Sequence, residues 1–206
     1  MIATHRATEP STVVLRRRDV RRLLPIADCI DAVERAFASH ATGRTIAPAV
    51  LGTHVEGGGF HVKAAGLFEA IGDQPVYAAK INANFPANPT ARGLPTIQGV
   101  LALFNAMDGR LLALMDSIEI TSLRTAAATA VAAKHLAPER GRVTIVGCGE
   151  QSVYQLRALA CVRDLDRVSA FDVVADRAER FAAQMRGELD VDVNVVRDFA
   201  DDAATS

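Results

Sequence analysis

The residues with the clearest chemical potential follow an apolar run over residues 143–146. This run leads into Gly147-Cys148-Gly149, and a helical pattern follows the turn. A strand, a glycine turn and a helix in this order are typical of a dinucleotide site. Gly147 permits a tight turn, and Gly149 lets the backbone approach a pyrophosphate because it has no Cβ. The N–H groups at the helix start then face the anion, which the helix dipole also favours.

Two further residues fit a dinucleotide site. Ser152 takes the third position of the glycine fingerprint and is small enough for close packing of helix on strand. Asp172 follows the next predicted strand, 23 residues after Gly149, close to the usual spacing of about 20. A carboxylate there bonds both ribose hydroxyls and repels a 2′-phosphate, so the sequence favours NAD over NADP. The alternative is a purely structural turn in which Asp172 caps a helix.

Composition limits the class of protein. Half of the 206 residues are hydrophobic and the formal net charge is −1, so nothing points to nucleic acid or an anionic membrane as partner. No apolar run approaches the roughly 20 residues of a membrane span. Cys29, Cys148 and Cys161 show neither metal spacing nor a disulfide framework, so no metal is expected and the cytoplasm is the predicted location. The arginines of residues 16–22 are interpreted as a solvated basic edge.

The first half of the chain predicts a mixed sheet with a helix packed on it. Residues 1–12 are expected to form a tail, and a helix follows Pro25 and ends at Gly43. Asp108-Gly109 predicts a hairpin turn, whereas residues 85–95, with three prolines, predict an ordered loop rather than a helix or strand. Apolar or alternating runs predict strands over residues 59–65, 76–81, 99–105 and 111–115.

The second half predicts a parallel sheet. An alanine-rich helix over Glu119–Leu136 contains no Gly or Pro and ends just before Pro138. Strands and helices then alternate, which is typical of βαβ units, so the fold class is α/β with the first half of a Rossmann-type doubly wound sheet. These alternating elements cover residues 142–146, 151–162, 168–171, 176–185 and 191–196.

A longer signature covers residues 77–137 and reads YAAKINANFPANPTARGLPTIQGVLALFNAMDGRLLALMDSIEITSLRTAAATAVAAKHLA. It combines a lysine before an asparagine-rich P-x-N loop, a G-L-P-T motif, a D-G-x-L-L-A-L-M-D hairpin and T-x-x-R-T-A-A at a helix start. With the G-x-G-x-Q turn of Gly147 to Gln151, it closely resembles the ornithine cyclodeaminase/mu-crystallin family over roughly residues 12–206.

The resemblance implies a homodimeric, NAD(P)-dependent enzyme with an amino acid or cyclic imino acid as its small-molecule partner. In ornithine cyclodeaminase the cofactor takes a hydride from the α-carbon, the distal amine attacks the imine, ammonia leaves, and the returned hydride gives proline. Other members reduce ketimines or interconvert alanine and pyruvate, and mu-crystallin can serve as a ligand-binding protein. The implied domains are a substrate-binding and dimerisation domain over 1–120, a connecting helix over 121–140 and an NAD-binding Rossmann domain over 141–206.

The resemblance also assigns residues to the substrate site. Lys80 matches the active-site lysine near the reacting carbon, where burial and neighbouring cations lower a lysine pKa; the alternative is a strand lysine that reaches solvent. Arg124 matches the arginine of R-T-A-A in the first turn of the helix, and a guanidinium can hold a carboxylate through two hydrogen bonds. An interdomain ion pair is its alternative. Thr96, in G-L-P-T, matches a position that lines the substrate and the nicotinamide.

Two more cations are candidates for the same site. Arg44 resembles the family's earlier carboxylate-binding arginine, although a solvated arginine after Gly43 fits nearly as well. Lys63 is shared with a bacterial branch of the family and can supply a second cation. His61 would share the strand face of Lys63 but is interpreted as structural. The implied cofactor-binding set is Thr96, Arg124, Gly147, Cys148, Gly149, Glu150, Gln151, Ser152 and Asp172.

The departure from the family lies at the C-terminal end. The family's catalytic aspartate and the remaining strands of its nucleotide sheet fall beyond Ser206. Asp201 and Asp202 are near this point, but no motif gives either of them the catalytic role. The chain is therefore interpreted as the N-terminal two-thirds of such an enzyme, a truncated product or an incomplete gene model, and little or no turnover is expected from it alone.

Overall fold

The computed structural model describes residues 11–198, so the predicted tail over residues 1–10 and the pair Asp201 and Asp202 lie outside the described residues. The chain forms two compact units. One contains the residues up to 23 together with 39–119, and the other contains residues 24–38 together with those from 120 onward. Within the described part, no helix combines the length and the apolar character that a membrane span requires.

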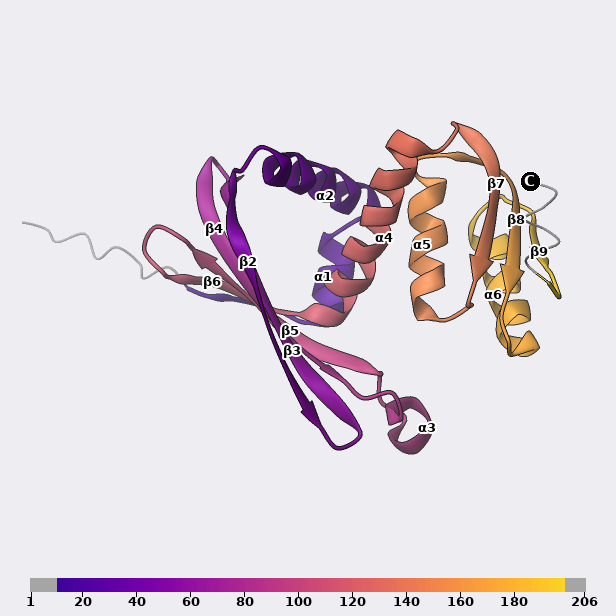
Figure 1. Cartoon of the computed structure of the whole chain (residues 1–206), viewed down its shortest axis with the longest axis horizontal. Helices are drawn as coiled ribbons and strands as arrows, with labels where there is room; N and C mark the ends of the chain where they lie inside the picture. The colour runs from indigo at the N-terminus through magenta and orange to yellow at the C-terminus, as the bar shows by residue number, and fades with distance from the viewer. Residues whose placement is uncertain (1–10, 199–206) are drawn as a thin grey trace, which may run out of the picture. The chain divides into compact units, whose positions relative to one another are not determined.

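The first unit is built on a six-stranded sheet with the strand order β1-β6-β5-β4-β3-β2 (Figure 1). All neighbouring strands are antiparallel except β1 and β6, which are parallel. The sheet is therefore mixed, as the alternating apolar runs predict. The strands are β1 (Val13–Leu15), β2 (Thr45–Val55), β3 (Gly58–Ile71), β4 (Gln74–Asn84), β5 (Ile97–Asn105) and β6 (Leu111–Asp116).

Short turns with left-handed residues join the antiparallel strands. Gly72 and Asp73 both have positive φ, at 54° and 61°, which is the requirement of a type I′ hairpin turn. The predicted hairpin at Asp108-Gly109 is confirmed, with Gly109 at φ 74° between β5 and β6. The Asp108 carboxylate accepts a hydrogen bond from the backbone N–H of Arg110 at 3.0 Å, which stabilises the turn.

A short helix lies within residues 85–95, where the sequence predicts a loop. The helix α3 (Asn88–Arg92) has a proline in its first turn, where the missing N–H has no intrahelical role. It ends at Gly93, whose φ is 64°. The buried side chain of Asn88 donates a hydrogen bond to the carbonyl of Pro95 at 3.3 Å and closes the loop. The prediction of a loop without a helix is therefore wrong for these five residues.

A second helix of the first unit is held by a buried carboxylate. The helix α1 (Arg17–Leu23) packs against β1 and β6. Glu119 is only 2% exposed. Arg17 donates to it at 3.2 Å and Arg21 at 2.9 Å. A buried carboxylate requires such partners because its desolvation is costly. The interpretation of a solvated basic edge is therefore wrong for Arg17 and Arg21, although it holds for the exposed Arg18.

The second unit contains a three-stranded parallel sheet with the order β7-β8-β9. Strand and helix alternate as predicted, and each element differs from its predicted bounds by only a few residues. The α/β class, with one mixed and one parallel sheet, is thereby confirmed. The elements are α2 (Ile26–Ala41), α4 (Ser117–Leu136), β7 (Arg140–Val146), α5 (Glu150–Ala160), β8 (Asp164–Phe171), α6 (Ala175–Glu188) and β9 (Val193–Val195).

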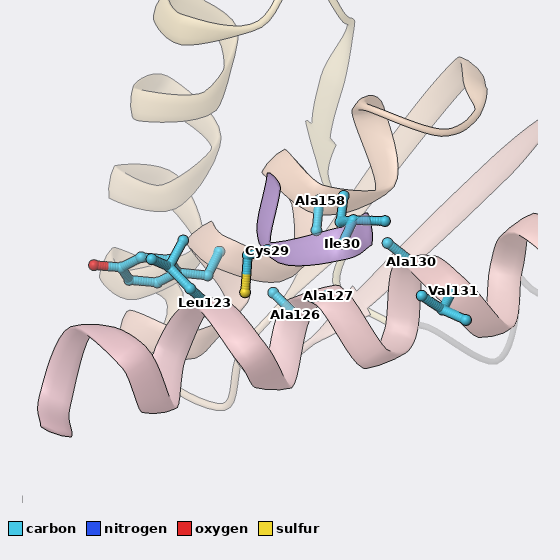
Figure 2. Close-up of a cluster of buried hydrophobic side chains, with 9 residues drawn as sticks. Cys29, Ile30, Leu123, Ala126, Ala127, Ala130, Val131 and Ala158 are labelled. Atoms are coloured by element: carbon cyan, nitrogen blue, oxygen red, sulfur yellow. The ribbon is translucent and has the colours of Figure 1, made fainter. Parts of the chain in front are cut away.

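Two apolar clusters hold the second unit together. In the first, small side chains of α4 allow α2 and α5 to approach closely, since three alanines of α4 are fully buried (Figure 2). In the second, α5 and α6 pack on the parallel sheet. The first cluster comprises Cys29, Ile30, Leu123, Ala126, Ala127, Ala130, Val131, Tyr154 and Ala158. The second comprises Cys148, Leu156, Val168, Ala170, Ala178, Phe181, Ala182, Met185 and Val193.

We predict that Glu119→Gln lowers the free energy of unfolding by about 1–3 kcal/mol, because a hydrogen-bonded charged group contributes roughly that amount. The amide keeps the shape of the side chain but loses the charge that Arg17 and Arg21 share. Urea denaturation followed by circular dichroism measures the change. Glu56→Gln, at an exposed turn residue, is the matched control and stays within about 0.5 kcal/mol of the parent. Equal stability of the two variants would contradict a structural role for Glu119.

Candidate functional site

The glycine turn after β7 has the geometry of an anion site. Gly147 has φ 91°, which favours glycine, and its N–H donates to the carbonyl of Phe171 at 2.8 Å. Gly149 precedes α5 with an extended backbone that any residue can adopt, and no side chain caps the helix there. A Cβ on Gly149 would also meet no atom within 4 Å. Neither backbone nor packing requires this glycine, so the open space at the helix start fits a bound pyrophosphate.

Asp172 connects the end of β8 to this turn. Its Oδ2 accepts the N–H of Cys148 at 2.8 Å, and its Oδ1 accepts the N–H of Val174 at 2.8 Å. These two hydrogen bonds hold the pKa of Asp172 below its usual range, and the one from Val174 has the larger effect. The carboxylate is therefore ionised at neutral pH. Each carboxylate oxygen can accept a further hydrogen bond, so ribose hydroxyls can still bind beside the two backbone contacts.

Cys148 contributes its backbone rather than its thiol. Burial, reinforced by the negative charge of Asp172, raises the pKa of this thiol to about 11. The side chain packs in the apolar cluster with α6 and lies 3.5 Å from the carbonyl of Phe171. Since the thiolate is the reactive form of cysteine, Cys148 is not a nucleophile near neutral pH. Its neutral side chain also adds no negative charge next to a phosphate.

The residues that open α5 have separate roles in the structure. The side-chain amide of Gln151 donates to the carbonyl of Ser122 in α4 at 3.1 Å. The buried hydroxyl of Ser152 donates to the carbonyl of Gly149, which allows close packing at the third fingerprint position. Glu150 is exposed at the first position of the helix. Gln151 therefore ties the helix after the turn to α4, the helix that carries Arg124.

Arg124 lies deeper in its helix than the sequence predicts. The carboxylate of Asp116 accepts the N–H of Ile118 at 2.9 Å, so α4 begins at Ser117 and Arg124 is its eighth residue. The placement in the first turn is therefore wrong, and the argument from the positive helix end no longer applies to this side chain. Arg124 is exposed. Burial raises the pKa of the neighbouring Cys29 thiol, and the positive charge of Arg124 opposes this shift.

In the first unit, the strand register places two lysines side by side. Lys63 of β3 and Lys80 of β4 are directly paired, so both side chains lie on one face of the sheet. Lys80 is half-buried and Lys63 is exposed. Like charges at directly opposite positions destabilise a sheet. An anion that contacts both ammonium groups removes this repulsion, so the pair is suited to a carboxylate.

Two other predicted residues lie away from this pair. Arg44 forms an ion pair with Glu69, and its carbonyl accepts the N–H of Phe68, five residues from Lys63 along β3. Thr96 lies just before β5, and its carbonyl accepts the N–H of Phe85 at 2.8 Å. Phe85 follows the end of β4 and is five residues from Lys80, and strands rise roughly 3.3 Å per residue. The sheet therefore does not bring Arg44 or Thr96 beside the lysine pair.

The same face carries a second polar row, which the sequence motifs do not assign to the site. His61 pairs with Asn82, and Asn82 pairs in turn with Gly99. The Asn82 Oδ1 accepts a hydrogen bond from the hydroxyl of Ser117 at 2.6 Å. A spacing of two residues from Lys80 is the signal that the sequence offers for Asn82, because alternate residues of a strand share a face.

The chain matches one protein family along almost its whole length. The model of the ornithine cyclodeaminase/mu-crystallin family matches residues 10–206. An alanine dehydrogenase from Archaeoglobus fulgidus is 35% identical over 173 residues, which are 84% of this chain and 52% of that protein. The chain thus spans about half the length of the curated relatives it matches.

Solved structures show the same fold. The structure of an archaeal alanine dehydrogenase dimer with bound NAD superimposes with a TM-score of 0.82 at 32% identity, over 90% of this chain and 56% of that one. The Thermococcus litoralis Δ1-pyrroline-2-carboxylate reductase, in complex with NADH and L-proline, gives a TM-score of 0.81 at 30% identity, over 90% of this chain and 57% of that one.

Proposed function

Because the chain belongs to the ornithine cyclodeaminase/mu-crystallin family, we propose that its whole protein is an NAD-dependent enzyme that acts on an amino acid or cyclic imino acid. The reaction class is oxidation of the α-carbon, or reduction of the corresponding imine. Deamination with ring closure of a diamino acid such as L-ornithine is the specific form we favour. In this scheme residues 1–120 bind substrate and form the dimer, residues 121–140 connect, and residues 141–206 bind NAD.

The register of Lys63 and Lys80 is the observation that carries the proposal. Two ammonium groups on one sheet face attract the carboxylate that all these substrates share. Lys80 is half-buried, as suits a group that holds or releases a proton near the reacting carbon. We assign Arg124 to a substrate oxygen, because a guanidinium binds carboxylates through two hydrogen bonds. Arg44 and Thr96 stay in the proposed binding set on the family motif alone.

The second unit supplies the proposed cofactor site. NAD, when bound, supplies the acceptor for the hydride that leaves the α-carbon. Gly147 and Gly149 leave room for its phosphates, and the N–H groups that start α5 face them. Asp172 is ionised and can accept the ribose hydroxyls, whereas a 2′-phosphate meets its negative charge. The relatives with bound NAD or NADH support the same choice of cofactor.

We also propose that the protein is a homodimer in the cytoplasm. One sheet face carries large exposed apolar side chains, since the exposed Leu51 and Ile81 flank the half-buried Val62 in one row across β2, β3 and β4. Such a face is typical of a surface that a partner covers, and the archaeal relative is a dimer. The free cysteines fit a reducing compartment. The exposed apolar residues of this face are Val14, Leu51, Phe60, Ile81 and Leu114.

Asp172→Ala is expected to weaken NAD binding at least tenfold and to reduce the preference for NAD over NADP. The variant loses the ribose acceptor and also the two bonds that hold Cys148 and Val174. Isothermal calorimetry with both cofactors measures the change. Asp176→Ala, an exposed acid four residues later, is the control and keeps the parent affinity. Unchanged NAD affinity in Asp172→Ala would sink the cofactor assignment.

For the whole enzyme we expect NADH formation with at least one of L-ornithine, L-lysine, L-alanine or L-proline, or NADH consumption with Δ1-pyrroline-2-carboxylate or with pyruvate and ammonia. Lys80→Met should lower kcat/KM at least about 100-fold, the usual contribution of a positioned acid or base. Lys134→Met, at an exposed lysine of α4, is the control. Absence of turnover across this panel with both nicotinamide cofactors argues against an enzyme and for a ligand-binding protein.

The double variant Leu51→Glu, Ile81→Glu should convert the dimer to a monomer, because two charges then face a partner across an apolar surface. Light scattering after size exclusion should give twice the chain mass of 21.9 kDa for the parent and once that mass for the variant. Leu136→Glu, at an exposed leucine of α4, should remain dimeric. A parent that is monomeric at micromolar concentration refutes the assigned interface.

A further inference from the structure

Asn82 lies next to the lysine pair on the same sheet face. It is two residues from Lys80 on β4, a separation of roughly 7 Å along a strand. Its direct neighbours across the sheet are His61 of β3 and Gly99 of β5. The row that contains Asn82 therefore borders the row of Lys63 and Lys80.

Ser117 donates a hydrogen bond to the amide oxygen of Asn82. The Ser117 hydroxyl is fully buried and donates to the Asn82 Oδ1 at 2.6 Å. Because the oxygen and nitrogen of a planar amide point in different directions, the Nδ2 group is turned away from Ser117. Asn82 itself is half-buried, and within residues 11–198 its Nδ2 donates to no protein group. The two N–H donors of this half-buried amide can therefore bind a ligand.

Gly99 is required for this arrangement. A Cβ at this position would lie 2.5 Å from the Asn82 Oδ1 and 2.8 Å from the Ser117 Oγ. It would also lie 2.2 Å from the backbone carbonyl of Ile81, which cannot move without breaking the strand. Any larger residue at position 99 would displace the hydrogen bond between Ser117 and Asn82. The glycine therefore preserves the orientation of the amide and leaves no side chain on that side of it.

We propose that Asn82 is a substrate-orienting residue whose Nδ2 donates a hydrogen bond to a carboxylate oxygen of the substrate. Lys63 and Lys80 supply the positive charge, which attracts an anion but defines its direction poorly. The fixed amide supplies the direction. This inference takes the class of substrate, an amino or imino acid, from the proposed function and adds a contact to it.

A purely structural role explains the residue less well. Asparagine is depleted in strands, where β-branched and aromatic residues fit the pleated surface better. Ser117 alone would be satisfied by any acceptor that reaches it. A buried structural asparagine normally uses its amide nitrogen as well as its oxygen, whereas within residues 11–198 this nitrogen donates to no protein group.

A binding experiment observes the Asn82 amide directly. The 206-residue chain, labelled with ¹⁵N at asparagine and saturated with NAD, is titrated with L-proline, L-alanine and L-ornithine. The side-chain amide signal of Asn82 is assigned by its loss in Asn82→Asp. We expect this signal to shift with at least one ligand, while the amide of Asn84, exposed two residues further along β4, does not. Shifts elsewhere without a shift at Asn82 overturn the inference, as does a spectrum in which no signal moves.

Kinetics of the whole enzyme then separate this inference from the proposed function. Asn82→Ala should raise KM at least tenfold and lower kcat less, with unchanged NAD affinity. Asn82→Asp should raise KM further, because its charge repels the carboxylate. Asn84→Ala, at an exposed residue two positions further along β4, is the control. If the parent turns over and Asn82→Ala keeps its KM, the inference fails while the proposed function stands. If the parent does not turn over, the proposed function fails and the titration decides on Asn82.

Discussion

The hydrogen-bond register between β3 and β4 decides which side chains of the first unit can act together. It pairs Lys63 with Lys80 and His61 with Asn82, and it sends Val62 and Ile81 to the other face. Because the side-chain period of a strand is two, a slip of one residue would exchange these faces. The lysines would then enter the apolar face and Ile81 would enter the polar rows. Both proposed surfaces of this unit, the substrate face and the dimer face, depend on this register.

Two backbone features lie beside this register, a hairpin turn and a glycine on the neighbouring strand. Gly72 and Asp73 adopt the left-handed pair of conformations that a two-residue hairpin needs, and β3 shifts its register against β4 between this turn and Leu67. On the neighbouring strand β5, Gly99 has no Cβ, which leaves room for Asn82 of β4 and Ser117 at the start of α4 to meet. Ser117 can then reach Asn82 from that helix. Residues far apart in the sequence are thus held together by backbone geometry as well as by ion pairs such as those of Glu119.

Local patterns in the sequence predict most of the elements but few of the long-range contacts. The alanine-rich helix and the strand–turn–helix at Gly147 follow from propensity and periodicity, which act over neighbouring residues. The helix α1 does not follow from such patterns, because the partner of Arg17 and Arg21 is Glu119, about 100 residues away. In the local sequence, a basic cluster that pairs with a distant buried acid looks the same as a basic cluster that faces solvent.

The candidate site shows the same division. Gly147, Asp172 and Lys80 carry motifs, so their residue types and spacing are sufficient to identify them as candidates. The T-x-x-R-T-A-A motif places Arg124 too early in α4, because the helix begins further upstream, where Asp116 caps it. No motif identifies Asn82, since its importance depends on a hydroxyl donated 35 residues later and on a glycine of a neighbouring strand. The spacing of residues along a strand predicts which face of the sheet a side chain lies on, but it does not predict which residues that side chain contacts.

The protonated thiol of Cys148 has a consequence for chemical intervention at the glycine turn. With a pKa of about 11, this sulfur presents almost no thiolate to peroxide or to electrophilic drugs in the cell. Oxidants are therefore poor regulators of the turn, even though a cysteine stands between its two glycines. A covalent inhibitor aimed at this position would need strong reversible affinity for the protein before its electrophile could react with so buried a thiol.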